Sequence, residues 1–264
     1  MEGIAIMDNY EKFKDEVLKL TKIDLSAYKE KQMRRRIDSL VEKRECKSYA
    51  EYVKLLSSKR DVFDEFVNFL TINVSEFYRN PDQWKLLTEE YVPELIDRFG
   101  KKLKIWSAAC STGDEPYSLV MALSKLIDIN QIKIYATDLD KQVIAHAKTG
   151  LYSEKSIAGV PDEYKKKFFT KVGQSYQISN QVKSRVEFRQ HNLLLDKYPT
   201  DYHMIVCRNV LIYFTEEAKH EVYKKFNASL VNHGILFIGS TEQVMDYKSI
   251  GYKRRSSFFY EKDV

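Results

Sequence analysis

The chain has 264 residues, 44% of them hydrophobic, and its 43 Lys and Arg residues against 38 Asp and Glu residues give a formal net charge of +5. This composition allows a substantial core and argues against disorder, and no apolar run reaches the roughly 20 residues that a membrane helix needs. Three widely separated cysteines match neither a zinc site nor a disulfide framework, so we expect no bound metal and a cytoplasmic protein. The lack of a long apolar run predicts no membrane insertion.

Residues 1 to about 100 are predicted to form helices joined by short turns. Ser48 and Glu51 have the spacing of a capping box, which predicts the start of one helix. Asn80, followed by a proline, predicts a helix N-cap, and a further helix is expected to open at Pro93. Apolar residues at helical spacing include Phe13, Val17 and Leu20, then Met33, Ile37, Leu40 and Val41.

From Lys101 onward the pattern changes to alternating strands and helices, which predicts a parallel sheet covered by helices on both faces. The connection at about 150–185 is too long for a simple crossover, so we expect a small inserted subdomain there. Residues 252–261 are predicted to form a final strand. The expected core elements are strand 103–107, helix 116–127, strand 132–137, helix 140–149, strand 186–190, strand 203–207, helix 215–231 and strand 234–239.

Polar residues follow each core strand, and parallel strands place them at the edge of the sheet where ligands of such folds bind. After the first strand, the small residues of 107–115 leave room for a ligand, and Glu115 would lie near a helix N-terminus. Asp138 follows the second strand, and its carboxylate suits the two hydroxyls of a ribose. Asn192, with a leucine after it, offers an amide and apolar surface to a purine, and Arg208 follows the fourth strand.

Each of these residues also has a purely structural interpretation. Asp138 could cap the next helix, Asn192 could be a turn residue and Arg208 could form a surface ion pair. Taken together, the four strand ends instead predict an adenosine-binding pocket. The loop has a single glycine, whereas a dinucleotide pyrophosphate needs a glycine-rich turn. A cofactor without phosphate, S-adenosylmethionine, fits better, with Glu115 pairing with its ammonium group.

Six longer segments stand out along the chain: TINVSEFYR (71–79), WSAACSTGDEPYS (106–118), ATDLD (136–140), HNLL (191–194), CRNVLIYF (207–214) and GSTE (239–242). In this order they closely resemble the bacterial chemotaxis receptor methyltransferases of the CheR type, over nearly the whole chain. The resemblance implies a Rossmann-like class I S-adenosylmethionine-dependent methyltransferase sheet in 77–264, with an inserted β subdomain at about 150–185. It also implies an all-helical, receptor-docking domain in 1–76.

The activity that the resemblance implies is protein-glutamate O-methylation in chemotactic adaptation. The methyl group of S-adenosylmethionine would pass to glutamate side chains on the cytoplasmic methylation helices of methyl-accepting chemotaxis receptors, leaving S-adenosylhomocysteine. We expect a monomer at receptor arrays that binds no nucleic acid. The implied catalytic pair is Arg79, to hold a carboxylate, and Tyr213, to orient the attacked oxygen. The implied cofactor contacts are Asn73, Ser75, Arg79, Glu115, Asp138, Asn192, Leu193, Arg208 and Asn209.

A basic segment in the second predicted helix suggests a docking surface, formed by Lys31, Arg34, Arg35 and Arg36. Lys31 and Arg35 are predicted to point furthest from the apolar stripe, and Arg34 and Arg36 to flank it. Such a face suits glutamate-rich receptor helices by charge complementarity, and a merely solvated helix face is the alternative.

A glutamate is already ionised at pH 7, because its pKa in model peptides is about 4.3, so its methylation needs alignment and desolvation rather than a base. Two other functions stay open from the sequence: a methyltransferase for another protein or a nucleic acid, and a non-catalytic cofactor-binding module. Residues 208–211 lack the NPPY-type segment of enzymes that methylate base amino groups. The intact Arg79, Asp138 and Tyr213 argue against loss of activity.

Overall fold

The computed structural model describes residues 9–263. The chain divides into two compact units. The first contains the chain up to Asn73 together with Tyr213–Lys219, and the second contains Val74–Ile212 and the chain from His220 onward. Within the described residues, no helix combines the length and the apolar character needed to cross a bilayer.

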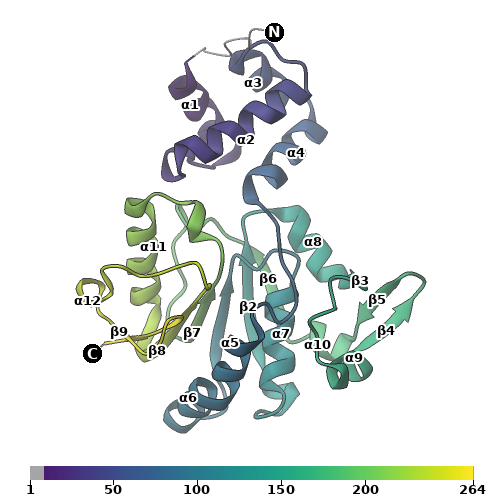
Figure 1. The fold of residues 1–264 in the computed structure, drawn as a ribbon, viewed down its shortest axis with the longest axis vertical. Helices are drawn as coiled ribbons and strands as arrows, with labels where there is room; N and C mark the ends of the chain where they lie inside the picture. Colours follow the sequence, from purple (N-terminus) through teal and green to yellow (C-terminus); the bar gives the residue numbers. More distant parts are fainter. Residues whose placement is uncertain (1–8, 264) are drawn as a thin grey trace. The chain divides into compact units, whose positions relative to one another are not determined.

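The first unit is built mainly from four helices around an aromatic core (Figure 1). Phe13 stacks on Tyr49 with 4.7 Å between ring centroids and meets the edge of Phe66 at 6.4 Å. The stripe predicted around Met33 and Ile37 is confirmed, because its members are buried. The helices are α1 (Tyr10–Thr21), α2 (Glu30–Lys43), α3 (Tyr49–Ser58) and α4 (Arg60–Thr71).

The capping box predicted at the start of α3 is confirmed with one variation. Ser48 Oγ accepts a hydrogen bond from the N–H of Glu51 at 3.2 Å. The Glu51 carboxylate accepts from the N–H of Lys47 at 2.7 Å, one residue before the usual partner at the N-cap. Both bonds fix the point at which the chain turns into α3.

The second unit is built on a seven-stranded sheet in the order β6-β2-β1-β7-β8-β10-β9. The predicted parallel core is confirmed, because β6, β2, β1, β7 and β8 all pair in parallel, and β10 joins them antiparallel to β8. The strands are β1 (Lys104–Ala108), β2 (Lys133–Asp138), β6 (Val186–Gln190), β7 (Tyr202–Cys207), β8 (Leu230–Ile238), β9 (Tyr252–Arg254) and β10 (Phe259–Lys262).

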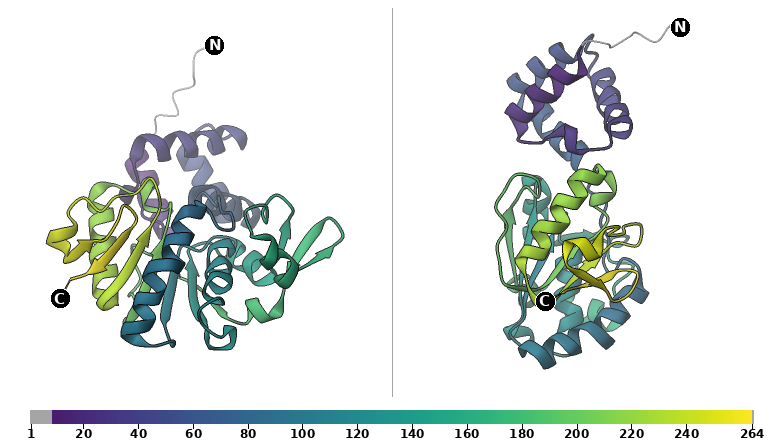
Figure 2. Two further views of the ribbon diagram at one scale, coloured as in Figure 1. Left: turned by 60° about the horizontal axis from the view of Figure 1, so that its bottom comes forward. Right: turned by 90° about the vertical axis from the view of Figure 1, so that its left-hand side faces the viewer.

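Helices cover both faces of this sheet (Figures 1 and 2). Tyr117 of α7 (Asp114–Leu123) packs on Phe188, whereas Phe226 of α11 (Glu216–Ser229) packs on Trp106. Register through Tyr135 puts Trp106 on the face opposite to Phe188. A third helix, α8 (Lys141–Thr149), follows β2. The strand order reverses between β1 and β7, which is where doubly wound folds bind ligands.

The helices predicted to start at the two prolines form one continuous helical run, α5 (Pro81–Leu86), a π-helical turn (Leu87–Tyr91) and α6 (Val92–Phe99). A proline has no N–H for a bond within the helix, and here the widened turn ends at Tyr91, two residues before Pro93. Asn80 lies at the N-cap position but does not cap α5 with its side chain. Its Oδ1 accepts instead from Nη2 of Arg208 at 3.1 Å.

The expected inserted subdomain is present as a three-stranded antiparallel sheet in the order β3-β5-β4. Figure 1 shows its β4–β5 hairpin projecting from the second unit. Its elements are β3 (Leu151–Ser153), α9 (Asp162–Phe168), β4 (Phe169–Val172), β5 (Ser175–Ile178) and α10 (Asn180–Lys183).

The prediction of one final strand over 252–261 is wrong. The segment forms an antiparallel hairpin of β9 and β10, closed by a bond from the N–H of Arg255 to the carbonyl of Phe259 at 2.9 Å. Arg255 also forms an ion pair with Glu94 at 2.9 Å. Arg254 is the last residue of β9, and residues 255–258 form the turn that leads into β10.

Candidate active site

The loop after β1 is held in a conformation that few residues tolerate. Ala109 and Ser111 have φ angles of 64° and 48°, and Gly113 has a φ of 91°. A side chain at Gly113 would also meet Ala147 Cβ at 2.9 Å. Non-glycine residues in the left-handed region carry strain, which folded proteins often concentrate at ligand sites.

Glu115, in the first turn of α7, is a largely buried carboxylate, with a side chain 13% exposed and two partners. Its Oε1 accepts from Ser107 Oγ at 2.8 Å, and its Oε2 lies 3.9 Å from Nη1 of Arg208. Burial raises the pKa of Glu115 to about 7, although Arg208 and Ser107 act in the opposite direction. A cation placed beside this group would favour its ionised form.

Asp138 is the last residue of β2, and its carboxylate accepts hydrogen bonds that hold the loop after β1 in place. Its Oδ2 accepts from the N–H of Ser111 at 2.8 Å, and its Oδ1 accepts from the N–H of Asp140 at 3.0 Å. Burial raises the pKa of Asp138 to about 6, against the effect of these bonds. The helix-cap interpretation of Asp138 is wrong, because Asp140 caps α8 through a bond from the N–H of Gln142.

Arg208 follows β7 and is buried, so the surface interpretation of this residue is wrong. Its Nη2 donates to the carbonyl of Arg79 at 2.8 Å and to Oε1 of Gln83 at 2.7 Å. The guanidinium also packs 4.7 Å from the ring centroid of Phe237. Burial lowers its pKa, and Glu115 opposes that shift. Arg208 therefore anchors the segment that carries Arg79 to the end of β7.

Glu242 is a structural partner of the site to which sequence reasoning gave no role. This buried carboxylate accepts four backbone N–H groups, from Gly239 and Asn209 at 2.8 Å, Val210 at 3.0 Å and Leu211 at 2.9 Å. It joins the end of β8 to the turn after β7. An acid that follows a core strand was the signal that identified Asp138, and the same signal applies to Glu242.

Asp114 is a second missed residue, and it explains where Ser75 lies. Its buried carboxylate accepts from Thr112 Oγ1 at 2.5 Å and from the Ser75 hydroxyl, and burial raises its pKa. Ser118 Oγ donates to the carbonyl of Asp114 at 2.7 Å and accepts from the N–H of Tyr78 at 3.1 Å. These contacts hold residues 75–78 against the start of α7.

The segment after β6 holds Asn192 and Leu193, which are both buried. Oδ1 of Asn192 accepts from the N–H of Leu194 at 2.9 Å, as the turn interpretation expects. The carbonyl of Leu193 accepts from the Tyr198 hydroxyl at 2.7 Å. The carbonyl side of the Asn192 amide is therefore committed to the turn.

Arg79 has weak internal ties compared with Arg208. Its Nη1 lies 3.5 Å from the Val74 carbonyl, its Nε lies 3.8 Å from Glu76 Oε1, and its side chain is 33% exposed. Its charge nevertheless reaches the site, because it helps to lower the pKa of Glu115. Arg79 is thus a guanidinium with donors available to a ligand.

Two of the candidate residues, Asn73 and Tyr213, belong to the first unit. Asn73 Nδ2 donates to Thr71 Oγ1 at 3.0 Å. Tyr213 ends a 3-10 turn, Leu211–Tyr213, and its carbonyl accepts from the N–H of Lys29 at 2.9 Å. The other candidate cofactor residues all lie in the second unit.

The basic segment of α2 divides as expected. Lys31 and Arg35 are exposed, and Arg34 and Arg36 are partly buried. Arg36 Nη2 donates to the carbonyl of Phe69 at 2.5 Å, and Arg34 lies 5.0 Å from the ring centroid of Tyr10. Two of the four cations are therefore engaged in holding the helices together.

The chemistry of the site fits S-adenosylmethionine. Three buried polar atoms at this edge, Ser111 Oγ, Arg208 Nε and Asn209 Oδ1, have no hydrogen-bond partner among the described residues. Such atoms are costly unless a ligand or water satisfies them. Together with the carboxylates of Glu115 and Asp138, they supply both donors and acceptors for an amino acid linked to a nucleoside.

Two family models match the chain. One, described as CheR methyltransferase, SAM binding domain, matches residues 73–257, and the other, described as CheR methyltransferase, all-alpha domain, matches residues 8–71. A "Chemotaxis protein methyltransferase" of Listeria innocua is 40% identical over 240 residues, covering 91% of this chain and 92% of the relative. "Chemotaxis protein methyltransferase 1" of Pseudomonas aeruginosa is 34% identical over 246 residues, covering 89% of each chain. A "Chemotaxis protein methyltransferase" of Borreliella burgdorferi is 30% identical over 259 residues, covering 90% of this chain and 92% of the relative.

Proposed function

The chain belongs to the CheR methyltransferase family, and from this premise we propose that its methyl acceptors are glutamate side chains of chemotaxis receptors. The protein is an S-adenosylmethionine-dependent methyltransferase of chemotaxis with a class I methyltransferase sheet. The family, fold class and cofactor predicted from the sequence are thereby confirmed.

The observation that supports a carboxylate acceptor is the contrast between two arginines at the sheet edge. Arg208 is buried and anchors the backbone of Arg79, whereas the Arg79 side chain is one-third exposed with only long internal contacts. A guanidinium with unused donors binds a carboxylate in a fixed, two-pronged geometry. An ionised glutamate is such a ligand.

The chemistry requires alignment rather than proton removal, since a glutamate carboxylate is ionised at neutral pH. When bound, the cofactor supplies a methyl group on a cationic sulfur, which a carboxylate oxygen takes up to leave S-adenosylhomocysteine. We assign Arg79 to holding the acceptor carboxylate or the cofactor end of the pocket, and Tyr213 to orienting the attacked oxygen. Displacement of water from the acceptor carboxylate would strengthen this weak nucleophile.

The cofactor assignments follow from the groups that each residue presents. Glu115 would hold the ammonium, Asp138 the ribose hydroxyls, and Asn192 with Leu193 the adenine. The remaining proposed contacts are Asn73, Ser75, Arg208 and Asn209.

We assign receptor docking to the helical domain, 1–76, and the chemistry to 77–264. The docking surface would be Lys31, Arg34, Arg35 and Arg36 of α2, and the partner a glutamate-rich methylation helix. The protein would act as a monomer in the cytoplasm, at receptor arrays.

The test is to incubate the purified protein with radiolabelled S-adenosylmethionine and membranes that contain chemoreceptors. We expect label in a receptor-sized band and its release as volatile methanol in base, which is diagnostic of a methyl ester. Bound cofactor without base-labile label in receptors would overturn the proposed acceptor. Parallel reactions with duplex DNA and with RNA are expected to stay unlabelled.

A further inference from the structure

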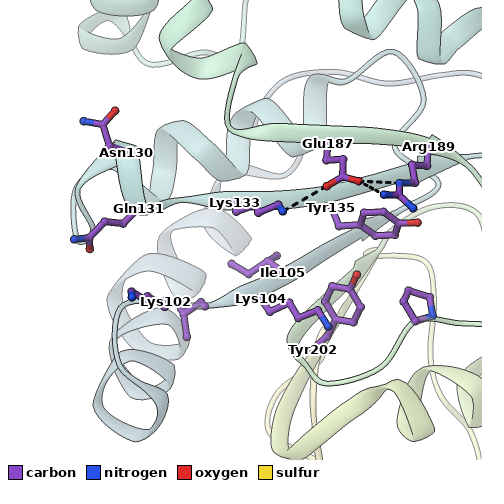
Figure 3. Close-up of a pocket in the computed structure, with 12 residues that line it drawn as sticks. Lys102, Lys104, Ile105, Asn130, Gln131, Lys133, Tyr135, Glu187, Arg189 and Tyr202 are labelled. Atoms are coloured by element: carbon purple, nitrogen blue, oxygen red, sulfur yellow. Dashed lines mark hydrogen bonds and ion pairs between the residues drawn. The ribbon is translucent and has the colours of Figure 1, made fainter.

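The sheet of the second unit carries a cavity that belongs to no part of the site described above (Figure 3). Its volume is about 710 Å³, within the range of roughly 300–1,000 Å³ typical of small-molecule sites. It is lined near the amino ends of β1, β2 and β7 by Lys104, Lys133 and Tyr202, and from β6 by Glu187 and Arg189. The cofactor candidates Glu115, Asp138, Asn192 and Arg208 follow the opposite, carboxyl ends of the strands.

The cavity exists because one connection lacks a covering helix. α7 and α8 follow β1 and β2, and α7 packs on the Phe188 face, but residues 191–201, which return from β6 to β7, contain no helix. On the other face, Tyr198 of this connection and Phe226 of α11 pack on Trp106. These two side chains cover the middle of that face, and the part near the amino ends of the strands stays uncovered.

Two tyrosines form an aromatic floor. The rings of Tyr135 and Tyr202 lie 6.2 Å apart between centroids, and Tyr202 lies 5.7 Å from Trp106. Tyr135 is half-buried, and its ring faces the cavity in Figure 3. Aromatic surfaces of this kind accept planar ring systems by stacking or edge contacts.

The charges around this floor are unbalanced. Four cationic side chains, Lys102, Lys104, Lys133 and Arg189, accompany one carboxylate, Glu187. Arg189 Nη2 lies 2.5 Å from that carboxylate, so Arg189 alone balances the charge of Glu187, and it is the main cause of the lowered pKa of Glu187. Lys133 Nζ, 3.5 Å from the same carboxylate, is a cation in excess of that balance.

Two further cations of the cavity come from the start of β1 and from the residues just before it. Lys104 Nζ donates to the Thr200 carbonyl at 2.6 Å and lies 4.7 Å from the ring centroid of Tyr202. Lys102 is exposed, and it has no ion-pair partner among residues 9–263. A neutral ligand would leave the ammonium groups of Lys102 and Lys104 without a counter-charge, whereas an anion would supply one.

We propose that this cavity is a second ligand site, for a free nucleotide-like anion, with its planar base against Tyr135 and its phosphate between Lys102, Lys104 and Lys133. The site is separate from the methyl-transfer chemistry, and it stands whatever the methyl acceptor is. The volume admits a mononucleotide, the floor suits its base, and the surplus of cations suits its phosphate.

The test is isothermal titration calorimetry with guanosine 5′-monophosphate on full-length protein saturated with S-adenosylhomocysteine, so that the cofactor site is already filled. We expect one binding event, weakened as salt rises from 0.05 to 0.5 M. Guanosine and inorganic phosphate, titrated separately, should each bind at least about tenfold more weakly, because each lacks half of the recognised groups.

A double change, Lys102→Glu with Lys133→Glu, should weaken the nucleotide at least about tenfold and leave methyl transfer unchanged, which shows that the variant is folded. The matched control is Lys101→Glu with Lys141→Glu, exposed lysines that do not line the cavity. No heat with the nucleotide, or inorganic phosphate binding as tightly as the nucleotide, would overturn the proposal. A tetraglutamate peptide that binds as tightly at the same lysines would also overturn it, in favour of a peptide surface.

Discussion

Charged residues gather in two parts of this protein, and the protein itself engages them to different degrees. At the carboxyl edge of the sheet, Glu242 accepts four backbone N–H groups, and Arg208 donates to the carbonyl of Arg79 and to Gln83. On helix α2, Lys31 and Arg35 are exposed, and their side chains have no hydrogen-bond or ion-pair partner among the described residues. Charge alone therefore does not reveal function, because the first group shapes the site and the second is available to a partner.

Arg79 belongs to the sheet edge by position, but its side chain has only weak internal contacts, like the available cations of α2. Replacing it by alanine should lower the turnover of receptor methylation by roughly 10²–10³-fold, because the acceptor carboxylate loses its positioning group. Arg79→Lys keeps the charge without the fork and should recover part of the rate. The measurement is steady-state transfer of labelled methyl groups, with cofactor affinity from calorimetry. Near-normal turnover in Arg79→Ala would remove its proposed role.

Glu242→Gln tests a carboxylate of which both oxygens accept hydrogen bonds from the backbone. An amide presents an NH₂ group where one oxygen accepted two N–H bonds, so we expect a loss of roughly 2–4 kcal/mol in the free energy of unfolding. The measurement is a urea unfolding curve. Glu163→Gln, an exposed residue paired with Lys125, is the matched control and should change stability by less than about 1 kcal/mol. Equal effects of both changes would show that the bonds at Glu242 contribute little.

The sheet and its site edge were largely predictable, because alternating apolar strands and strand-end polar residues are local signals. The hairpin of β9 and β10 was missed, since the turn between them, residues 255–258, lacks glycine, proline and asparagine. The sequence left open that Arg208 forms a surface ion pair. Its packing on Phe237 and its hydrogen bond to Gln83 explain why it is buried instead. Burial and partner choice depend on residues more than 100 positions away, which no local pattern contains.

The buried acids at the sheet edge should make cofactor binding depend on pH. The pKa of Glu115 is raised to about 7 and that of Asp138 to about 6. An ammonium needs the ionised carboxylate of Glu115, so binding releases a proton at low pH, and affinity should rise with pH, by about tenfold from pH 6 to pH 8. Calorimetry with S-adenosylhomocysteine measures this profile.

A variant distinguishes the source of that pH dependence. Ser107→Ala removes a hydroxyl that lowers the pKa of Glu115, so the rise in affinity should move to higher pH. The Glu115→Gln variant should bind S-adenosylhomocysteine more weakly, and its affinity should change little with pH above pH 7. A wild-type profile that is flat from pH 6 to pH 8 would show that Glu115 is already ionised in the free protein.

The smallest expected effect belongs to the available cations of α2. Lys31→Glu with Arg35→Glu should raise the KM for receptor roughly three- to tenfold at low salt, with the free energy of unfolding unchanged, and the difference should shrink as salt increases. Lys54→Glu with Lys59→Glu alters the net charge equally on other exposed residues of the same unit, so it separates a local surface from a general charge effect. Arg36→Ala should behave differently, because Arg36 bonds the carbonyl of Phe69 and its loss should lower stability. If the two double variants raise KM equally, α2 is a solvated face, and the contrast between engaged and available charges does not identify the docking surface.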